Sequence, residues 1–124
     1  MLFRSSSEIN ILAQVENLDG LKNLEEIIDT EGIDGIFIGP SDLSASMGKL
    51  GSSSDKTVED EIKKALQLII GKNKPAGIIA LSNEGGKQRF RQGFDFVAVA
   101  HDAHFISKEL HSLKSEFFNY LQQI

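Results

Sequence analysis

The sequence predicts an α/β fold in which four parallel strands alternate with amphipathic helices. Short, continuous apolar segments recur four times along the 124 residues. Each is followed by a segment whose apolar residues recur at helical spacing. Strands that are apolar along their whole length are typical of a parallel sheet covered by helices. Four such units fit either a small open sheet or half of an eight-stranded barrel of about 250 residues. We expect one partial domain over residues 1–124.

The first unit begins with a strand predicted within residues 9–16, where β-branched residues are frequent. Asn17 follows it and is suited to cap a helix. The next segment has apolar residues on one face and acidic residues on the other, which predicts an amphipathic helix. Gly32 is suited to end that helix.

The second unit has a buried strand predicted at residues 35–39, closed by Pro40. A long loop rich in Ser and Gly is expected from Pro40 to Lys56. The helix after it has an apolar face, and its outer face carries Glu59 four residues before Lys63. That orientation favours an ion pair along the helix.

The last two units are predicted from the same alternation. Strands are expected at residues 76–81 and 94–100. The helix between them, over residues 84–92, is weaker because two glycines lie in its first turn. The final helix, from about residue 103 to the end, carries a long apolar stripe.

The composition is that of an ordinary globular protein, 40% apolar and 25% charged. The formal net charge of −5 argues against nucleic-acid binding, because no basic stripe is available to meet phosphates. The absence of cysteine excludes disulfides, thiolate zinc sites and cysteine nucleophiles. No apolar run approaches the ~20 residues of a membrane helix, and the first residues lack a signal peptide's apolar core. We expect a cytoplasmic protein.

Two carboxylates follow neighbouring strands. Glu16 ends the first strand and Asp42 lies just after the second, so a parallel sheet would present both at one edge. Two carboxylates that lie so near each other repel unless a cation or a proton lies between them. Oxygen ligands of this kind suit Mg²⁺ or Mn²⁺. Spacing alone leaves a commoner alternative open, in which Asp42 caps a short helix and Glu16 is a solvated strand end.

Two further features lie at strand ends. Gly39 and the amides after it could bind a carboxylate or phosphate, or Gly39 could serve only the backbone angles of a turn. His101 and His104 follow the fourth strand and could be metal ligands or a general base. Their alternative role is that of solvated residues in a loop and first helical turn.

Several of these segments together resemble the HpcH/HpaI aldolase family, which includes 4-hydroxy-2-oxoheptanedioate aldolase and 2-dehydro-3-deoxyglucarate aldolase. The most specific are Gln14-Val15-Glu16 and the run from Gly32 to Gly48 that contains Gly39-Pro40-Ser41-Asp42. Residues 76–80 and 94–99 resemble the family's seventh and eighth strands. The resemblance covers nearly the whole chain from residue 9, and it implies the second half of a (β/α)8 TIM barrel of the phosphoenolpyruvate/pyruvate type.

The resemblance implies a divalent-metal-dependent class II aldolase. Such a carbon–carbon lyase releases pyruvate from a 4-hydroxy-2-oxo acid or a 2-dehydro-3-deoxy sugar acid. Glu16 and Asp42 match the family's metal ligands, for Mg²⁺, Mn²⁺ or Co²⁺. Gln14 matches a residue of the pyruvate pocket. The amides of Ser41 and Asp42, beside Gly39, match those that hold the substrate carboxylate, although the family more often has alanine in place of Ser41.

The resemblance also implies that catalytic groups lie elsewhere. The family's substrate-polarising arginine and acid–base histidine come from the first half of the barrel, and we expect no catalytic residue matching them here. Four strands cannot close a barrel, and open strand edges invite pairing. We therefore expect a homo-oligomer or a complementing first-half chain. The alternatives are a half-barrel that binds metal and a 2-oxo acid without turnover, or a truncated remnant.

Overall fold

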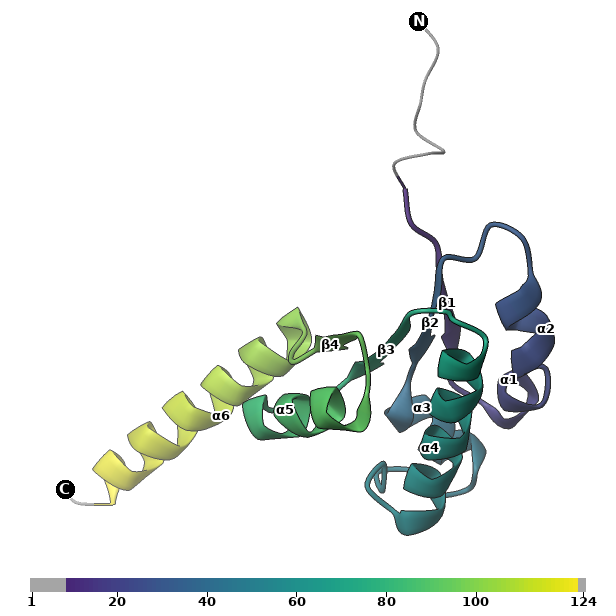
Figure 1. Ribbon diagram of the computed structural model, residues 1–124. Helices are drawn as coiled ribbons and strands as arrows, with labels where there is room; N and C mark the ends of the chain where they lie inside the picture. Colours follow the sequence, from purple (N-terminus) through teal and green to yellow (C-terminus); the bar gives the residue numbers. More distant parts are fainter. Residues whose placement is uncertain (1–8, 123–124) are drawn as a thin grey trace, which may run out of the picture.

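The strands of the sheet are all parallel and stand side by side in chain order (Figure 1). The structure is a computed structural model and describes residues 9–122. Within those residues the strands are β1 (Leu12–Val15), β2 (Gly35–Ile38), β3 (Ala76–Ile79) and β4 (Phe96–Ala98). Each lies inside one of the four predicted strand ranges and is shorter than it.

One face of the sheet holds the core. The register pairs Val15 with Ile38, Ile38 with Ile78, and Ile78 with Val97, so these residues form one row across the sheet. That row packs with the buried side chains of the helices, among them Ile62 of α4. Because the sheet is in chain order and one row of each strand meets helices, it has the architecture of a barrel wall. The predicted fold class is confirmed.

The helices follow the strands as the alternation predicts. Asn17 caps the first of them, and its Oδ1 accepts a hydrogen bond from the Gly20 amide at 2.7 Å. The helices are α1 (Leu18–Lys22), α2 (Leu24–Asp29), α3 (Pro40–Ser46), α4 (Lys56–Gly71), α5 (Asn83–Gln92) and α6 (Asp102–Leu121). No helix within residues 9–122 is long and apolar enough to cross a membrane.

Three local expectations were wrong. The helix predicted after Asn17 is divided into α1 and α2, which meet at Asn23. The loop predicted from Pro40 begins with α3, because proline fixes the backbone angle required at a first helical position. Glu59 does not pair with Lys63 along its own helix but with Arg89 of α5.

The apolar stripe predicted on the last helix is exposed. Ile106, Leu110, Leu113 and Phe117 of α6 are each between 61% and 67% exposed. Figure 1 shows α6 extending away from the sheet. No residue of α6 is buried in the structure.

Candidate functional site

Glu16 lies directly after β1, at the edge of the sheet where the strands end. Its carboxylate oxygen Oε2 accepts a hydrogen bond from Gln14 Nε2 at 2.5 Å. Gln14 and Glu16 are two residues apart, so the alternation of an extended chain places them on the same face. That face is opposite the row that packs against the helices, since Val15 between them is buried in the core. The amide of Gln14 therefore fixes the orientation of the carboxylate.

Gly39 is packed against this pair. A Cβ atom placed on Gly39 would lie 3.0 Å from Glu16 Cβ and 3.2 Å from both Gln14 Nε2 and Glu16 Oε2. Its φ of −102° is open to any residue, so the glycine is needed for space and not for a special backbone angle. Its N–H donates to the carbonyl of Val15 at 3.1 Å, which holds the end of β2 against the end of β1.

Ser41 and Asp42 lie in the first turn of α3, immediately beyond Gly39. Both side chains are exposed. The helix begins with Gly39 as its N-cap and Pro40 as its first residue, and no side chain caps it. Asp42 thus does not have the capping role that spacing alone left open. Asp42 follows β2, the strand that neighbours β1, and this is where the sequence predicts the second carboxylate.

The donors at this edge are suited to a hard divalent cation. Glu16 and Asp42 offer carboxylate oxygens, and neither nitrogen nor sulfur ligands accompany them in the part of the chain described. No group of three or more His, Asp or Glu residues that could hold a metal occurs within residues 9–122. Two carboxylates suit an ion such as Mg²⁺, which keeps several waters or substrate oxygens in its coordination shell. The residues present are therefore compatible with such an ion.

The two histidines after β4 have a structural role in this chain. His101 is the N-cap of α6, and its ring nitrogen Nδ1 accepts a hydrogen bond from the His104 amide at 3.1 Å. The two rings lie edge to face with their centroids 6.0 Å apart. His101 thus begins the last helix, which agrees with the second of the two roles left open by the sequence.

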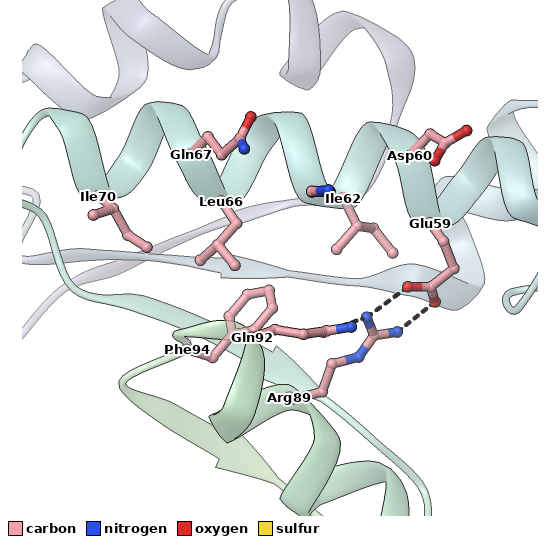
Figure 2. A pocket seen from close by; sticks show the side chains of 10 residues that line it. Glu59, Asp60, Ile62, Leu66, Gln67, Ile70, Arg89, Gln92 and Phe94 are labelled. Carbon is pink, nitrogen blue, oxygen red and sulfur yellow. Dashed lines mark hydrogen bonds and ion pairs between the residues drawn. The ribbon is translucent and has the colours of Figure 1, made fainter.

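A bidentate ion pair joins α4 to α5 and was not anticipated from the sequence. Arg89 donates from Nη1 and Nη2 to the two carboxylate oxygens of Glu59 at 2.7 and 2.5 Å (Figure 2). On one side of this pair lies a hollow of about 370 Å³ between the helices, lined by apolar residues such as Leu66 and Phe94. A more polar hollow, which Glu59 and Arg89 also line, opens on the side of Ser41.

Comparison with known families and proteins gives a consistent result. The family model described as HpcH/HpaI aldolase/citrate lyase matches residues 3–108. The chain is 41% identical over 116 residues to a hydroxypyruvate/pyruvate aldolase from Deinococcus radiodurans, covering 94% of this chain and 42% of that protein. It is 35% identical over 118 residues to a 4-hydroxy-2-oxo-heptane-1,7-dioate aldolase from Shigella flexneri, covering 95% and 44%. The chain therefore spans less than half the length of these curated relatives.

Solved structures show the same partial coverage. An HpcH/HpaI aldolase/citrate lyase family protein from Burkholderia cenocepacia superposes with a TM-score of 0.79 at 27% identity, covering 90% of this chain and 43% of that one. The citrate lyase beta subunit from Mycobacterium tuberculosis, solved with oxaloacetate and magnesium, superposes with a TM-score of 0.61 at 21% identity. It covers 77% of this chain and 48% of its own, and the likeness is one of fold.

Proposed function

Because the chain belongs to the HpcH/HpaI aldolase/citrate lyase family, we propose that it supplies the metal- and pyruvate-binding half of a class II aldolase. The reaction is carbon–carbon cleavage of a 4-hydroxy-2-oxo acid or a 2-dehydro-3-deoxy sugar acid with release of pyruvate. In this proposal catalytic turnover requires a closed eight-stranded barrel, and four of its strands come from outside the sheet described here. The proposal includes either a second copy or a complementing first-half chain as the partner that closes it.

The observation that carries the proposal is the packing of three residues at one edge of the sheet. The carboxylate of Glu16 is held by Gln14 at 2.5 Å and lies over a glycine, Gly39, that leaves it room. Asp42 lies in the first turn of α3, which follows the neighbouring strand β2. Carboxylates that bind a cation are typically held in orientation by a hydrogen bond from a neighbouring side chain, as Gln14 holds Glu16.

Glu16 and Asp42 would hold the divalent ion, which when bound supplies Lewis-acid stabilisation of the negative charge that develops on the 2-oxo acid. Gln14 keeps the Glu16 carboxylate in place through its hydrogen bond. The N–H groups of Ser41 and Asp42, in the first turn of α3, have no partner within the helix and are placed to bind the substrate carboxylate. No residue of this chain is assigned to acid–base catalysis.

The chemistry of relatives supports the choice of ligands. One relative is named a hydroxypyruvate/pyruvate aldolase, and a protein of the same fold was solved with oxaloacetate, a 2-oxo acid, together with magnesium. The oxygen-only donor set of Glu16 and Asp42 favours Mg²⁺, Mn²⁺ or Co²⁺ over softer ions. The ligand pair we propose is therefore a divalent cation and pyruvate.

The test is a titration of the purified chain with Mn²⁺ and then pyruvate, followed by thermal unfolding. We expect Mn²⁺ to raise the melting temperature and pyruvate to raise it further, because ligands that bind only the folded state stabilise it. Glu16→Gln and Asp42→Asn should each abolish the response. Glu26→Gln, an exposed carboxylate on α2, is the matched control and should retain it. An unchanged response in both site variants would disprove the assignment.

A second candidate function is binding of metal and 2-oxo acid without turnover. It is favoured by the absence of any match in this chain to the family's arginine and acid–base histidine. Release of pyruvate from a 4-hydroxy-2-oxo acid, assayed with the same metal-loaded chain, separates the two functions. Sedimentation of the active or inactive sample shows whether a second copy accompanies turnover.

A further inference from the structure

The sheet is built from two units that begin in the same way. Before β2, the N–H of Asp34 donates to the carbonyl of Ile11 at 2.8 Å, and the Ile11 amide donates to Oδ2 of Asp34 at 2.7 Å. Before β4, Asp95 makes the same two hydrogen bonds with Ala76, each at 2.8 Å. In both units an aspartate thus binds the start of the preceding strand.

The strand registers repeat as well. Leu12 of β1 lies opposite Gly35 of β2, and Gly77 of β3 lies opposite Phe96 of β4. Each of these four residues directly follows a member of one of the two aspartate pairs. In pairing geometry β3 therefore corresponds to β1, and β4 corresponds to β2.

Two edges of the sheet have no partner strand within residues 9–122, one along β1 and one along β4. Apolar side chains are exposed at both edges, since Ile9 and Ile11 are 62% and 52% exposed and Val99 is 43% exposed. Strands of a parallel sheet are normally covered on both faces, and an unpaired edge can pair with another chain. Both edges are therefore suited to pairing.

The face of the sheet turned away from the helices is also only partly covered. The rings of Phe37 and Phe96 stack with their centroids 5.9 Å apart, and both residues are half-buried. In a closed parallel barrel the side chains of this face fill the interior. The two rings are thus placed to be covered by strands from the far side of a barrel.

The two units are joined in the chain by the pairing of β2 with β3, in which Ile36 lies opposite Ala76. Since β4 corresponds to β2 and β1 to β3, the same join can be made between β4 of one copy and β1 of another. Val97 is the equivalent of Ile36, because each lies two residues after its aspartate, and Ile11 is the equivalent of Ala76. The join therefore places Val97 opposite Ile11 of the second copy.

This join gives the stagger that a barrel needs. The core row passes from Val15 through Ile38 and Ile78 to Val97. The join continues the row to Ile11 of the second copy, four residues before Val15. Passage through the second copy adds the same displacement, and the total of eight residues is the shear of an eight-stranded parallel barrel.

We infer that two copies of this chain close one eight-stranded barrel, with β4 of each copy paired to β1 of the other. The inference names the partner that the proposed function leaves open, and it rests on that function only for the need to close a barrel. The strands of both copies run in the same direction, so the two Glu16–Asp42 edges open at one mouth. A symmetric dimer of this kind leaves neither β1 nor β4 with an unpaired edge.

The test uses the absence of cysteine from the chain. In the variant Ile11→Cys, Val97→Cys, pairing across the join brings the two Cα atoms to about 5 Å from each other, within the range that a disulfide spans. Within one chain the two positions are on the outer strands, about 14 Å apart, and cannot be bridged. We expect sedimentation to give the mass of two chains and mild oxidation to link them covalently.

The variant Ile9→Cys, Val97→Cys is the matched control for the register. Its two positions are displaced by two residues along the strand, which puts their Cα atoms roughly 8 Å apart, too far for a disulfide. A monomer before oxidation would overturn the inference, and it is the result expected if a chain of different sequence closes the barrel. A dimer that the control pair links as well as the Ile11–Val97 pair does, or that neither pair links, would also overturn it.

A charge placed on the join gives a second measurement. Ile11→Lys replaces an exposed apolar side chain, so circular dichroism should show that the variant folds as the parent does. The dimer should be weakened at least about tenfold, because an ammonium group would lie against the apolar join in both copies. Leu50→Lys, in the loop before α4 and 83% exposed, is the control and should form the dimer as the parent does. A folded Ile11→Lys protein with the dimer affinity of the parent would contradict the join.

The two proposals fail separately. The response of the melting temperature to Mn²⁺ reports on the Glu16–Asp42 edge, whereas the sedimenting mass and the disulfide report on the join without any metal. A cross-linked dimer that does not respond to Mn²⁺ contradicts the proposed function alone. A monomer that responds to Mn²⁺ contradicts the inference alone.

Discussion

The packing of Gly39 against Glu16 leads to a prediction about metal affinity. In Gly39→Ala the new Cβ would lie 3.0 Å from Glu16 Cβ and 3.2 Å from Glu16 Oε2. Ordinary carbon contacts begin near 3.5 Å, so Glu16 must move by a few tenths of an ångström. The backbone angles of Gly39 allow alanine, which leaves crowding of the carboxylate as the main effect.

The magnitude follows from how well Glu16 can yield. Overpacking in a closed interior costs about 1–3 kcal/mol, and Glu16 is only partly buried, so we expect about 1 kcal/mol. For a domain of this size that lowers the melting temperature by about 4 °C. Displacing a metal ligand and its hydrogen bond to Gln14 typically weakens metal binding about 10-fold to 100-fold. Gly39→Ala should therefore raise the dissociation constant for Mn²⁺ by at least about tenfold.

The assay is isothermal titration with Mn²⁺, with thermal unfolding of the same samples. Gly71→Ala is the matched control, because a Cβ there meets no atom within 4 Å and alanine suits the end of α4. It should leave Mn²⁺ affinity unchanged and stability equal or slightly higher. A folded Gly39→Ala protein that binds Mn²⁺ as the parent does would refute the reasoning that Glu16 is both a ligand and confined by Gly39.

Two further predictions concern stability. Gly77→Ala places a Cβ 2.1 Å from ring atoms of Phe96, so the ring must leave its position. The free energy of unfolding measured in urea should fall by at least about 2 kcal/mol. An unfolding midpoint equal to that of the parent would contradict this expectation. Hydrogen bonds from Lys49 and then Thr57 hold the pKa of Asp55 at about 2, below its ordinary 3.8. The lowered pKa of Asp55 stabilises the fold above pH 3.8, and this stabilisation is lost as the pH falls toward 2. The stability of Asp55→Asn should therefore fall less than that of the parent in unfolding curves between about pH 5 and 2. Equal acid sensitivity of the two proteins would contradict the prediction.

The strands were predictable because their signal is local. Residues such as Ile36 and Ile78 belong to continuous apolar runs, and burial of such runs in a helix-covered parallel sheet follows from their composition. Helix α3 was missed for an equally local reason. Its serine-rich sequence favours turns over helix interiors, and the helix is formed by Pro40 at its start and by burial of Leu43 against the core.

The pairing of Glu59 could not be predicted from its neighbours in sequence. A Lys four residues later is a suitable partner in an isolated helix, yet Arg89, 30 residues away, binds both carboxylate oxygens. The guanidinium presents two parallel donors in a fixed geometry, which a lysine cannot offer. The competition is decided by the approach of α5 to α4 in the folded chain, and the neutral character of the polar hollow depends on its outcome.

The position of the candidate site follows from the alternation of side chains along two strands. Val15 is buried against the helices, so its neighbours Gln14 and Glu16 face the opposite side of the sheet. On the next strand Ile38 is buried in the same row as Val15, which puts Phe37 and Gly39 on the side of Gln14 and Glu16. The amide of Gln14, the carboxylate of Glu16 and Gly39 thus meet on the face turned away from the helices. The alternation of side chains that buries Val15 and Ile38 in the core also places the charge of Glu16 outside it.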